Sequence, residues 1–149
     1  MTIRIAESDT ELRKVSGVLR QLRPAFDTER LVAQIKAQMR EGYRVAYVEE
    51  AGEVLCAAGF VVGTKLAWGK HVYVDDLVTA EHQRSKGAGA KMIVWLKTYA
   101  REQGCNQLHL DSGVQRFAAH RFYLREGFNI GSHHFSITDL GADAVKTRR

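Results

Sequence analysis

The chain is poor in proline, cysteine and long apolar runs: it has one proline and two cysteines in 149 residues. Cys56 and Cys105 have neither metal-ligand nor redox spacing, so we expect two reduced, mostly buried thiols and no metal site. Reduced thiols are typical of the cytoplasm, where we expect this protein. No window approaches the roughly 18 apolar residues of a membrane span, and the N-terminus lacks the apolar stretch of a signal peptide. We therefore expect no membrane partner.

Positive charge is in mild excess, with a formal net charge of +5. A basic surface suits an anionic ligand, and it suits nucleic acid as well. However, no dense run of Lys and Arg with interleaved aromatic residues precedes the terminal Lys146–Arg149, so we expect no nucleic-acid partner. Without a Ser/Gly-rich linker or a repeat, the sequence predicts one domain over residues 1–141 and a basic tail over residues 142–149.

Hydrophobic periodicity and turn signals predict the element order β-α-α-β-β-β-α-β-α-β. Ser8 with Glu11 forms a capping box before the first helix, Asp27 caps the second, and Ala51-Gly52 is typical of a hairpin. We expect an α/β (α+β) domain with a mixed, mostly antiparallel sheet flanked by helices. The predicted strands are Thr2–Ala6, Tyr43–Glu49, Val54–Val62, Val72–Thr79, Leu108–Ser112 and Phe128–Thr138, and the two last helices are Ala90–Gln103 and Gln115–Glu126.

The segment Arg84–Gly89 follows an apolar strand and leads directly into a helix. Small residues let backbone N–H groups approach a phosphate, and the helix dipole adds about half a positive charge at that end. The segment lacks the third glycine of a dinucleotide fingerprint and the Gly-Lys-Ser/Thr ending of a nucleoside triphosphate loop. It predicts a phosphate site, and the alternative is a Gly-rich turn with solvated Arg84 and Lys86.

A second pattern lies in the last predicted helix. Ala119 and the pair Phe122-Tyr123 fall on neighbouring helical turns, and Gly127-Phe128 follows them. The small Ala119 permits a close approach, and the Tyr123 hydroxyl is able to donate a proton. The alternative, favoured for Phe122, is that both rings only pack in the core.

Together these patterns resemble the GNAT superfamily of N-acetyltransferases. The family's first signature, Gln/Arg-x-x-Gly-x-Gly/Ala, matches Arg84, Gly87 and Gly89, and its second, an aromatic-Tyr pair followed by Gly-Phe, matches Phe122-Tyr123 and Gly127-Phe128. The resemblance implies acetyl-CoA as the donor. It also implies a set of donor-binding residues: Leu77, Val78, Thr79, Arg84, Ser85, Lys86, Gly87, Ala88, Gly89, Ala90, Arg116, Ala119 and Phe122. Arg116 departs from the family, since many members have Asn at this position.

The chemistry requires a base for the amine, because a protonated amine with a pKa near 10 is unreactive. Asp75 and Asp76 interrupt the fourth strand, where family members often carry an acidic base. Adjacent strand residues face opposite sides unless a bulge intervenes; alternation groups Asp75 with Tyr73 and Leu77, and we favour Asp75 slightly. The resemblance places Tyr123 at the thioester sulfur as the acid. His120, Asp111 and Ser112 are the candidates for contact with the acceptor.

The acceptor is not specified by the sequence beyond an amine, carried by a small molecule or a peptide. A CoA-binding regulatory module without turnover is one alternative function, and a nucleic-acid-binding domain is another. A homodimer is common in the family and stays open here.

Overall fold

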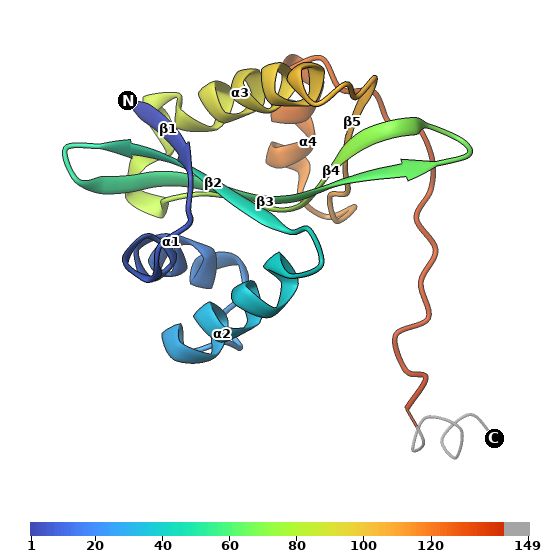
Figure 1. The fold of residues 1–149 in the computed structure, drawn as a ribbon. Coiled ribbons are helices and arrows are strands. Elements are labelled where there is room, and N and C mark those ends of the chain that lie inside the picture. Colours follow the sequence, from blue (N-terminus) through green and yellow to red (C-terminus); the bar gives the residue numbers. More distant parts are fainter. Residues whose placement is uncertain (142–149) are drawn as a thin grey trace. The chain divides into compact units, whose positions relative to one another are not determined.

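The computed structural model describes residues 1–141, and residues 83–85 by their backbone only. The chain divides into two compact units, Met1–Ser112 and Gly113–Arg149, each of which is described by itself. The second unit, described up to Gly141, contains α4 (Phe117–Arg125). The first unit holds all the other elements, in the order β1 (Thr2–Ile5), α1 (Asp9–Leu22), α2 (Thr28–Met39), β2 (Arg44–Glu50), β3 (Glu53–Lys65), β4 (Gly69–Thr79), the 3-10 helix η1 (Glu81–Lys86), α3 (Ala88–Glu102) and β5 (Gln107–Leu110) (Figure 1).

The first unit is built on a five-stranded sheet with the strand order β1-β2-β3-β4-β5. The first four strands pair antiparallel, and β5 pairs parallel with β4. Figure 1 shows α1 and α2 on one face of this sheet and α3 on the other. The predicted α/β architecture, a mixed and mostly antiparallel sheet flanked by helices, is therefore confirmed.

The local signals for the first helices and the hairpin are confirmed in detail. Ser8 and Glu11 form both hydrogen bonds of the capping box, and the Asp27 side chain accepts from the backbone N–H of Arg30. Ala51 and Gly52 both have positive φ, 51° and 81°, as a tight hairpin with matching twist requires. These elements depend on hydrogen bonds and turn conformations between residues close in the sequence, so the sequence was enough to predict them.

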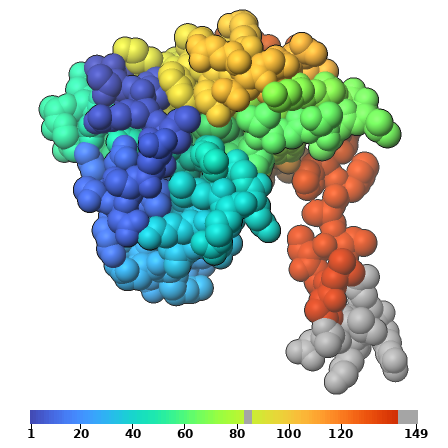
Figure 2. Space-filling model, viewed as in Figure 1, coloured from blue at the N-terminus to red at the C-terminus, as the bar shows by residue number. Residues whose placement is uncertain are grey.

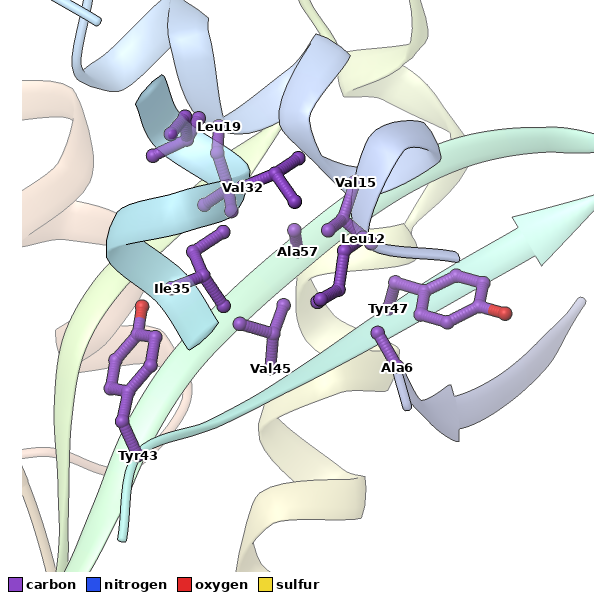
Figure 3. Close-up of a cluster of buried hydrophobic side chains, with 11 residues drawn as sticks. Ala6, Leu12, Val15, Leu19, Val32, Ile35, Tyr43, Val45, Tyr47 and Ala57 are labelled. Atoms are coloured by element: carbon purple, nitrogen blue, oxygen red, sulfur yellow. The ribbon is translucent and has the colours of Figure 1, made fainter. Parts of the chain in front are cut away.

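Two cores cover the two faces of the sheet. Figure 3 shows the core beneath α1 and α2, where aliphatic side chains of the helices meet Tyr43, Val45 and Ala57 of the β2–β3 region. On the opposite face, Phe60 packs edge-on against Trp95 and Tyr99 of α3, with ring centroids 6.1 and 5.2 Å apart. Each face of β3 and β4 thus has its own helical cover.

The predicted last strand, Phe128–Thr138, is wrong: residues 128–141 form neither strand nor helix. An alternating apolar pattern becomes a strand only where a neighbour takes up its backbone hydrogen bonds. The apolar side chains of this segment stay exposed instead, as in Ile130, Phe135 and Ile137. Within the described residues, the structure also contains no helix that is long and apolar enough to cross a membrane.

Candidate active site

A β-bulge interrupts β4 at the acidic pair. The register with β3 runs Gly59↔Asp76 and then Phe60↔Val74, so Asp75 is an extra residue without a partner. A bulge of this kind bends the strand and re-aims a side chain, and bulges are common beside active sites. It is the feature that shapes the candidate site.

The bulge places both carboxylates on the same face of the sheet. Tyr73 of β4 pairs with Val61 of β3, and Asp76 of β4 pairs with Gly59 of β3. Val61 and Gly59 are two residues apart on β3. Residues two apart on a strand share a face, and so do paired residues, so Asp76 lies on the same face as Tyr73. Asp75 is two residues after Tyr73 on β4 and lies on that face as well. The expectation that alternation separates the pair is therefore wrong, as is the grouping of Asp75 with Leu77. Leu77 pairs with Ala58 on the opposite face.

Asp76 is held in place by two residues from outside β4. The Tyr43 hydroxyl donates to Asp76 Oδ2 at 2.6 Å, and Arg23, the residue after α1, donates from Nε to Oδ1 at 2.9 Å. The same guanidinium also donates to the Asp75 carbonyl oxygen at 3.2 Å. Burial, followed by repulsion from Asp76, raises the pKa of Tyr43, so its hydroxyl stays a neutral donor. Asp76 thus anchors the bulge.

Asp75, by contrast, is exposed at the apex of the bulge. Its pKa is raised, first by partial desolvation of the carboxyl group and then by the negative charge of Asp76; Asp111 adds a smaller push, while Arg23 opposes it. A raised pKa makes a carboxylate a better proton acceptor near neutral pH. Asp75 is therefore both accessible and raised in pKa, whereas both carboxylate oxygens of Asp76 are engaged by Tyr43 and Arg23.

A second acidic position lies on the neighbouring strand. The Tyr73 hydroxyl donates to Asp111 Oδ2, directly after β5. Burial, followed by this hydrogen bond, raises the pKa of Tyr73. Next to it, Ser112 Oγ is buried and has no hydrogen-bond partner within the described part of the chain. The predicted acceptor-contact residues Asp111 and Ser112 thus lie beside the Tyr73–Asp75 face of the sheet.

The outer edge of β4 is open beyond this point. β5 pairs with β4 only across His71–Val74, whereas β4 continues to Thr79. The two strands therefore diverge after Val74. Among the described residues, one backbone edge of residues 75–79 has no strand partner, and this edge includes the predicted donor-binding residues Leu77, Val78 and Thr79. Backbone N–H and C=O groups on such an edge are ready to pair with an extended amide-bearing chain.

The predicted phosphate loop has the geometry that an anion requires. Gly87 adopts φ 78°, ψ 12°, and α3 begins at Ala88 without a side-chain cap. The first intrahelical bond runs from Lys91 N–H to the Gly87 carbonyl, which leaves the N–H groups of Ala88, Gly89 and Ala90 without helical partners. A Cβ built on Gly87 would meet no atom of the described residues within 4 Å. An uncapped helix start beside open space fits a pyrophosphate. The side chains of Arg84 and Ser85 lie outside the described residues, and Lys86 is exposed at the end of η1.

The second unit holds the aromatic helix motif. Tyr123 is the buried residue of α4, and its ring packs against Phe122 and Phe128, with centroids 5.5 and 5.8 Å apart. His120 Nε2 lies 2.7 Å from the Gly113 carbonyl oxygen, which identifies Nε2 as the protonated nitrogen. Arg116 is the residue before the first turn of α4, and Ala119 lies within that turn. The roles predicted for Arg116, Ala119, Phe122, Tyr123 and His120 stay predictions.

Sequence reasoning missed Arg23 and Tyr43. Both lie far from Asp76 along the chain, and neither belongs to a motif. The one available signal was Gly59, a glycine inside a strand, which often marks a close approach of another group. No group of three or more His, Cys, Asp or Glu side chains among the described residues is placed to hold a metal ion.

Comparisons with known proteins bear on the family and the fold. The family model described as Acetyltransferase (GNAT) family matches residues 13–128. The uncharacterized N-acetyltransferase YhdJ of Bacillus subtilis (strain 168) is 32% identical over 120 residues, which cover 79% of this chain and 84% of that protein. The aminoalkylphosphonate N-acetyltransferase of Salmonella typhimurium is 34% identical over 65 residues, 44% of this chain and 41% of that protein.

A solved structure shows the same fold. The aminoglycoside N-acetyltransferase AAC(6')-Iy in complex with CoA aligns with a TM-score of 0.80 at 13% identity, covering 94% of this chain and 96% of that one. The chain therefore belongs to the acetyltransferase (GNAT) family. The expectation of an acetyl-CoA-dependent N-acetyltransferase is confirmed at the level of this enzyme class.

Proposed function

We propose that this chain transfers an acetyl group from acetyl-CoA to a primary amine by direct attack within a ternary complex. The observation that carries the proposal is Asp75: an exposed carboxylate with a raised pKa, at a bulge where the open edge of β4 begins. The fold thus puts a proton acceptor beside a backbone edge suited to an amide-bearing arm. An uncapped helix start follows shortly afterwards in the chain.

The donor binds through backbone groups. Acetyl-CoA supplies the acetyl group as a thioester, together with a thiolate leaving group. The N–H groups of Ala88, Gly89 and Ala90 would hold the pyrophosphate, and the helix dipole strengthens them. The backbone edge of Leu77–Thr79 would pair with the pantetheine amides, and N–H groups on that edge would polarise the thioester carbonyl.

Two side chains transfer the protons, one as general base and one as general acid. Asp75 accepts the proton that the amine must lose to become a nucleophile. Tyr123 donates a proton to the sulfur as the carbon–sulfur bond breaks. A thiol with a pKa near 8.5 is a fair leaving group, so Tyr123 needs to supply only modest help. Asp76 keeps the bulge in place through Tyr43 and Arg23 and transfers no proton.

The acceptor is an amine of a small molecule or a peptide. The names of two similar proteins point to two acceptor chemistries: an aminoalkylphosphonate, which carries an amine and an anion, and an aminoglycoside, which carries several amines. Asp75 and Asp111 suit the ammonium group that both share.

The test is a thiol-release assay with acetyl-CoA and a panel of amines, with product mass measured in parallel. We expect release of CoA thiol and a product heavier by one acetyl group. The competing function is a CoA-binding regulatory module. Binding of acetyl-CoA by calorimetry, without release of thiol on any amine, would favour that module.

A further inference from the structure

A cluster of rings covers the far end of the β3–β4 hairpin, on the face that carries Tyr73. Trp68 stacks on His109 at 3.5 Å between centroids and 9° between planes, and Tyr73 lies parallel to both at 6.0 and 6.3 Å. His71 packs edge-on against Trp68 at 5.0 Å. We call Trp68, His71, Tyr73 and His109 the aromatic shelf. Figure 2 shows this hairpin, in green, at the surface of the first unit.

Lys65 supplies the charge of the shelf. Its Nζ lies 3.9 Å from the centroid of Trp68 and 5.5 Å from that of Tyr73. No carboxylate of the described part of the chain pairs with it. Burial, followed by the nearby His71 and Lys65, lowers the pKa of His109, which favours the uncharged imidazole ring. The ammonium group of Lys65 thus places a positive charge on the shelf.

A positive and a negative charge lie close together on this face: the Lys65 ammonium group at one end, and the carboxylates of Asp75 and Asp111 at the other. Tyr73 connects the two ends: its ring lies near Lys65, and its hydroxyl donates to Asp111, which acts electrostatically on Asp75. A rise of about 3.3 Å per strand residue puts Asp75 roughly 7 Å beyond Tyr73. The cationic and anionic ends are therefore on the order of 10 Å apart.

We propose that the aromatic shelf is the acceptor's second subsite, and that Lys65 binds an anionic group, a carboxylate or a phosphonate, at the end of the acceptor remote from the reacting amine. The proposal rests on the proposed function and names its substrate class: amines that also carry an anion. The amine reaches Asp75, the hydrocarbon part lies along the rings of Tyr73 and Trp68, and the anion pairs with Lys65.

A dicationic acceptor fits this face less well. Its second ammonium group would meet the Lys65 ammonium on the same ring faces, and like charges at this distance repel. An anion instead gains an ion pair with Lys65, to which the described residues supply no carboxylate. The stacked rings hold the Lys65 ammonium group in place, so less entropy is lost when the anion binds.

The experiment compares three acceptor series that differ only at the remote end: linear ω-amino carboxylates, their ω-amino amides and the matching α,ω-diamines, each with about four to eight carbons, chosen to bracket the estimated separation. Values of kcat/KM are measured for the natural chain, Lys65→Gln and Lys65→Glu. The matched control is Lys70→Gln, because Lys70 is an exposed lysine of the same hairpin on the opposite face.

We expect the natural chain to prefer the carboxylates, and Lys65→Gln to lose about tenfold in kcat/KM on them, a loss of about 1.4 kcal/mol. The amides should change little, Lys65→Glu should favour the diamines, and Lys70→Gln should keep the natural preference. A natural preference for diamines would overturn the proposal, as would equal losses on all three series in Lys65→Gln. If no acceptor of any kind releases thiol, the proposed function itself fails, which is a different result.

Discussion

Gly59 leaves the space in which the Tyr43 hydroxyl lies: a Cβ on Gly59 would collide with that oxygen. Gly59 is also the register partner of Asp76, and the hydroxyl lying over it donates to Asp76 Oδ2 at 2.6 Å. A missing side chain on β3 therefore allows a tyrosine just before β2 to fix a carboxylate on β4.

Gly59→Ala should disturb the site as well as the fold. The added methyl group has to displace the buried Tyr43 ring, and overpacking of this kind costs about 1–3 kcal/mol. We expect a lower free energy of unfolding in urea and a lower kcat in the fraction that stays folded. Gly17→Ala is the control, because a Cβ there meets no atom within 4 Å. Equal stability and turnover in Gly59→Ala and the natural chain would contradict this role of Tyr43.

The charges around Asp75 should shift its titration in opposite directions. Arg23 lowers the pKa of Asp75 and Asp111 raises it. Arg23→Gln should therefore move the acid limb of the kcat/KM–pH profile to higher pH, and Asp111→Asn should move it to lower pH. The measurement is the pH dependence of thiol release for both variants. A limb that stays in place in both variants would mean that Asp75 does not control it.

Tyr123→Phe should retain affinity for acetyl-CoA and lose turnover, since only the hydroxyl group is removed. General acid catalysis contributes about 10²–10⁴-fold, and a thiolate leaving group favours the low end of that range. Calorimetry and thiol release measure the two effects separately. If turnover stays unchanged across the pH range, the ring of Tyr123 serves packing alone.

Stability at low pH should depend on Glu11. The Tyr47 hydroxyl donates to Glu11 at 2.6 Å, and this bond with the capping hydrogen bonds lowers the pKa of Glu11 from 4.5 to about 2. The ionised carboxylate therefore stabilises the fold fully above about pH 4.5, and this contribution is lost as the pH falls toward 2.

Tyr47→Phe should thus cost about 1.5–3 kcal/mol near neutral pH and progressively less in acid, as expected for a hydrogen bond to a charged group. Urea unfolding between about pH 6 and about pH 3 measures this. Tyr99→Phe is the control, since the Tyr99 ring packs on Phe60 and Trp95. A Tyr47→Phe loss that does not change with pH would point to packing instead of ionisation.

The sequence predicted the elements whose signals are local. The capping box at Ser8, the Asp27 cap and the Ala51-Gly52 hairpin depend on neighbours within a few residues, and each is confirmed. Phe128–Thr138 failed because a strand also needs a ladder partner, which an alternating pattern does not specify.

The sequence predicted the residues and segments that make up the site, but it did not predict how the fold places them relative to one another. The acidic pair, the Gly-rich helix start and donor-binding residues on the fourth strand were all expected. The bulge at Asp75 was not, because register is a property of two strands, and the Asp75-Asp76 sequence is compatible with either register. The anchors Arg23 and Tyr43 reach Asp76 only through the tertiary fold.

The most direct test of the account is the pH dependence of acetyl transfer in Asp75→Asn compared with Asp76→Asn, each first shown to be folded and to bind acetyl-CoA. We expect Asp75→Asn to lose about 100-fold or more in kcat/KM at low pH, with the loss shrinking toward the acceptor's own pKa, where the amine is already neutral. Asp76→Asn should show lower stability and a smaller loss that is flat with pH. A pH-dependent loss in Asp76→Asn with a flat profile in Asp75→Asn would contradict the assignment of Asp75 as the base.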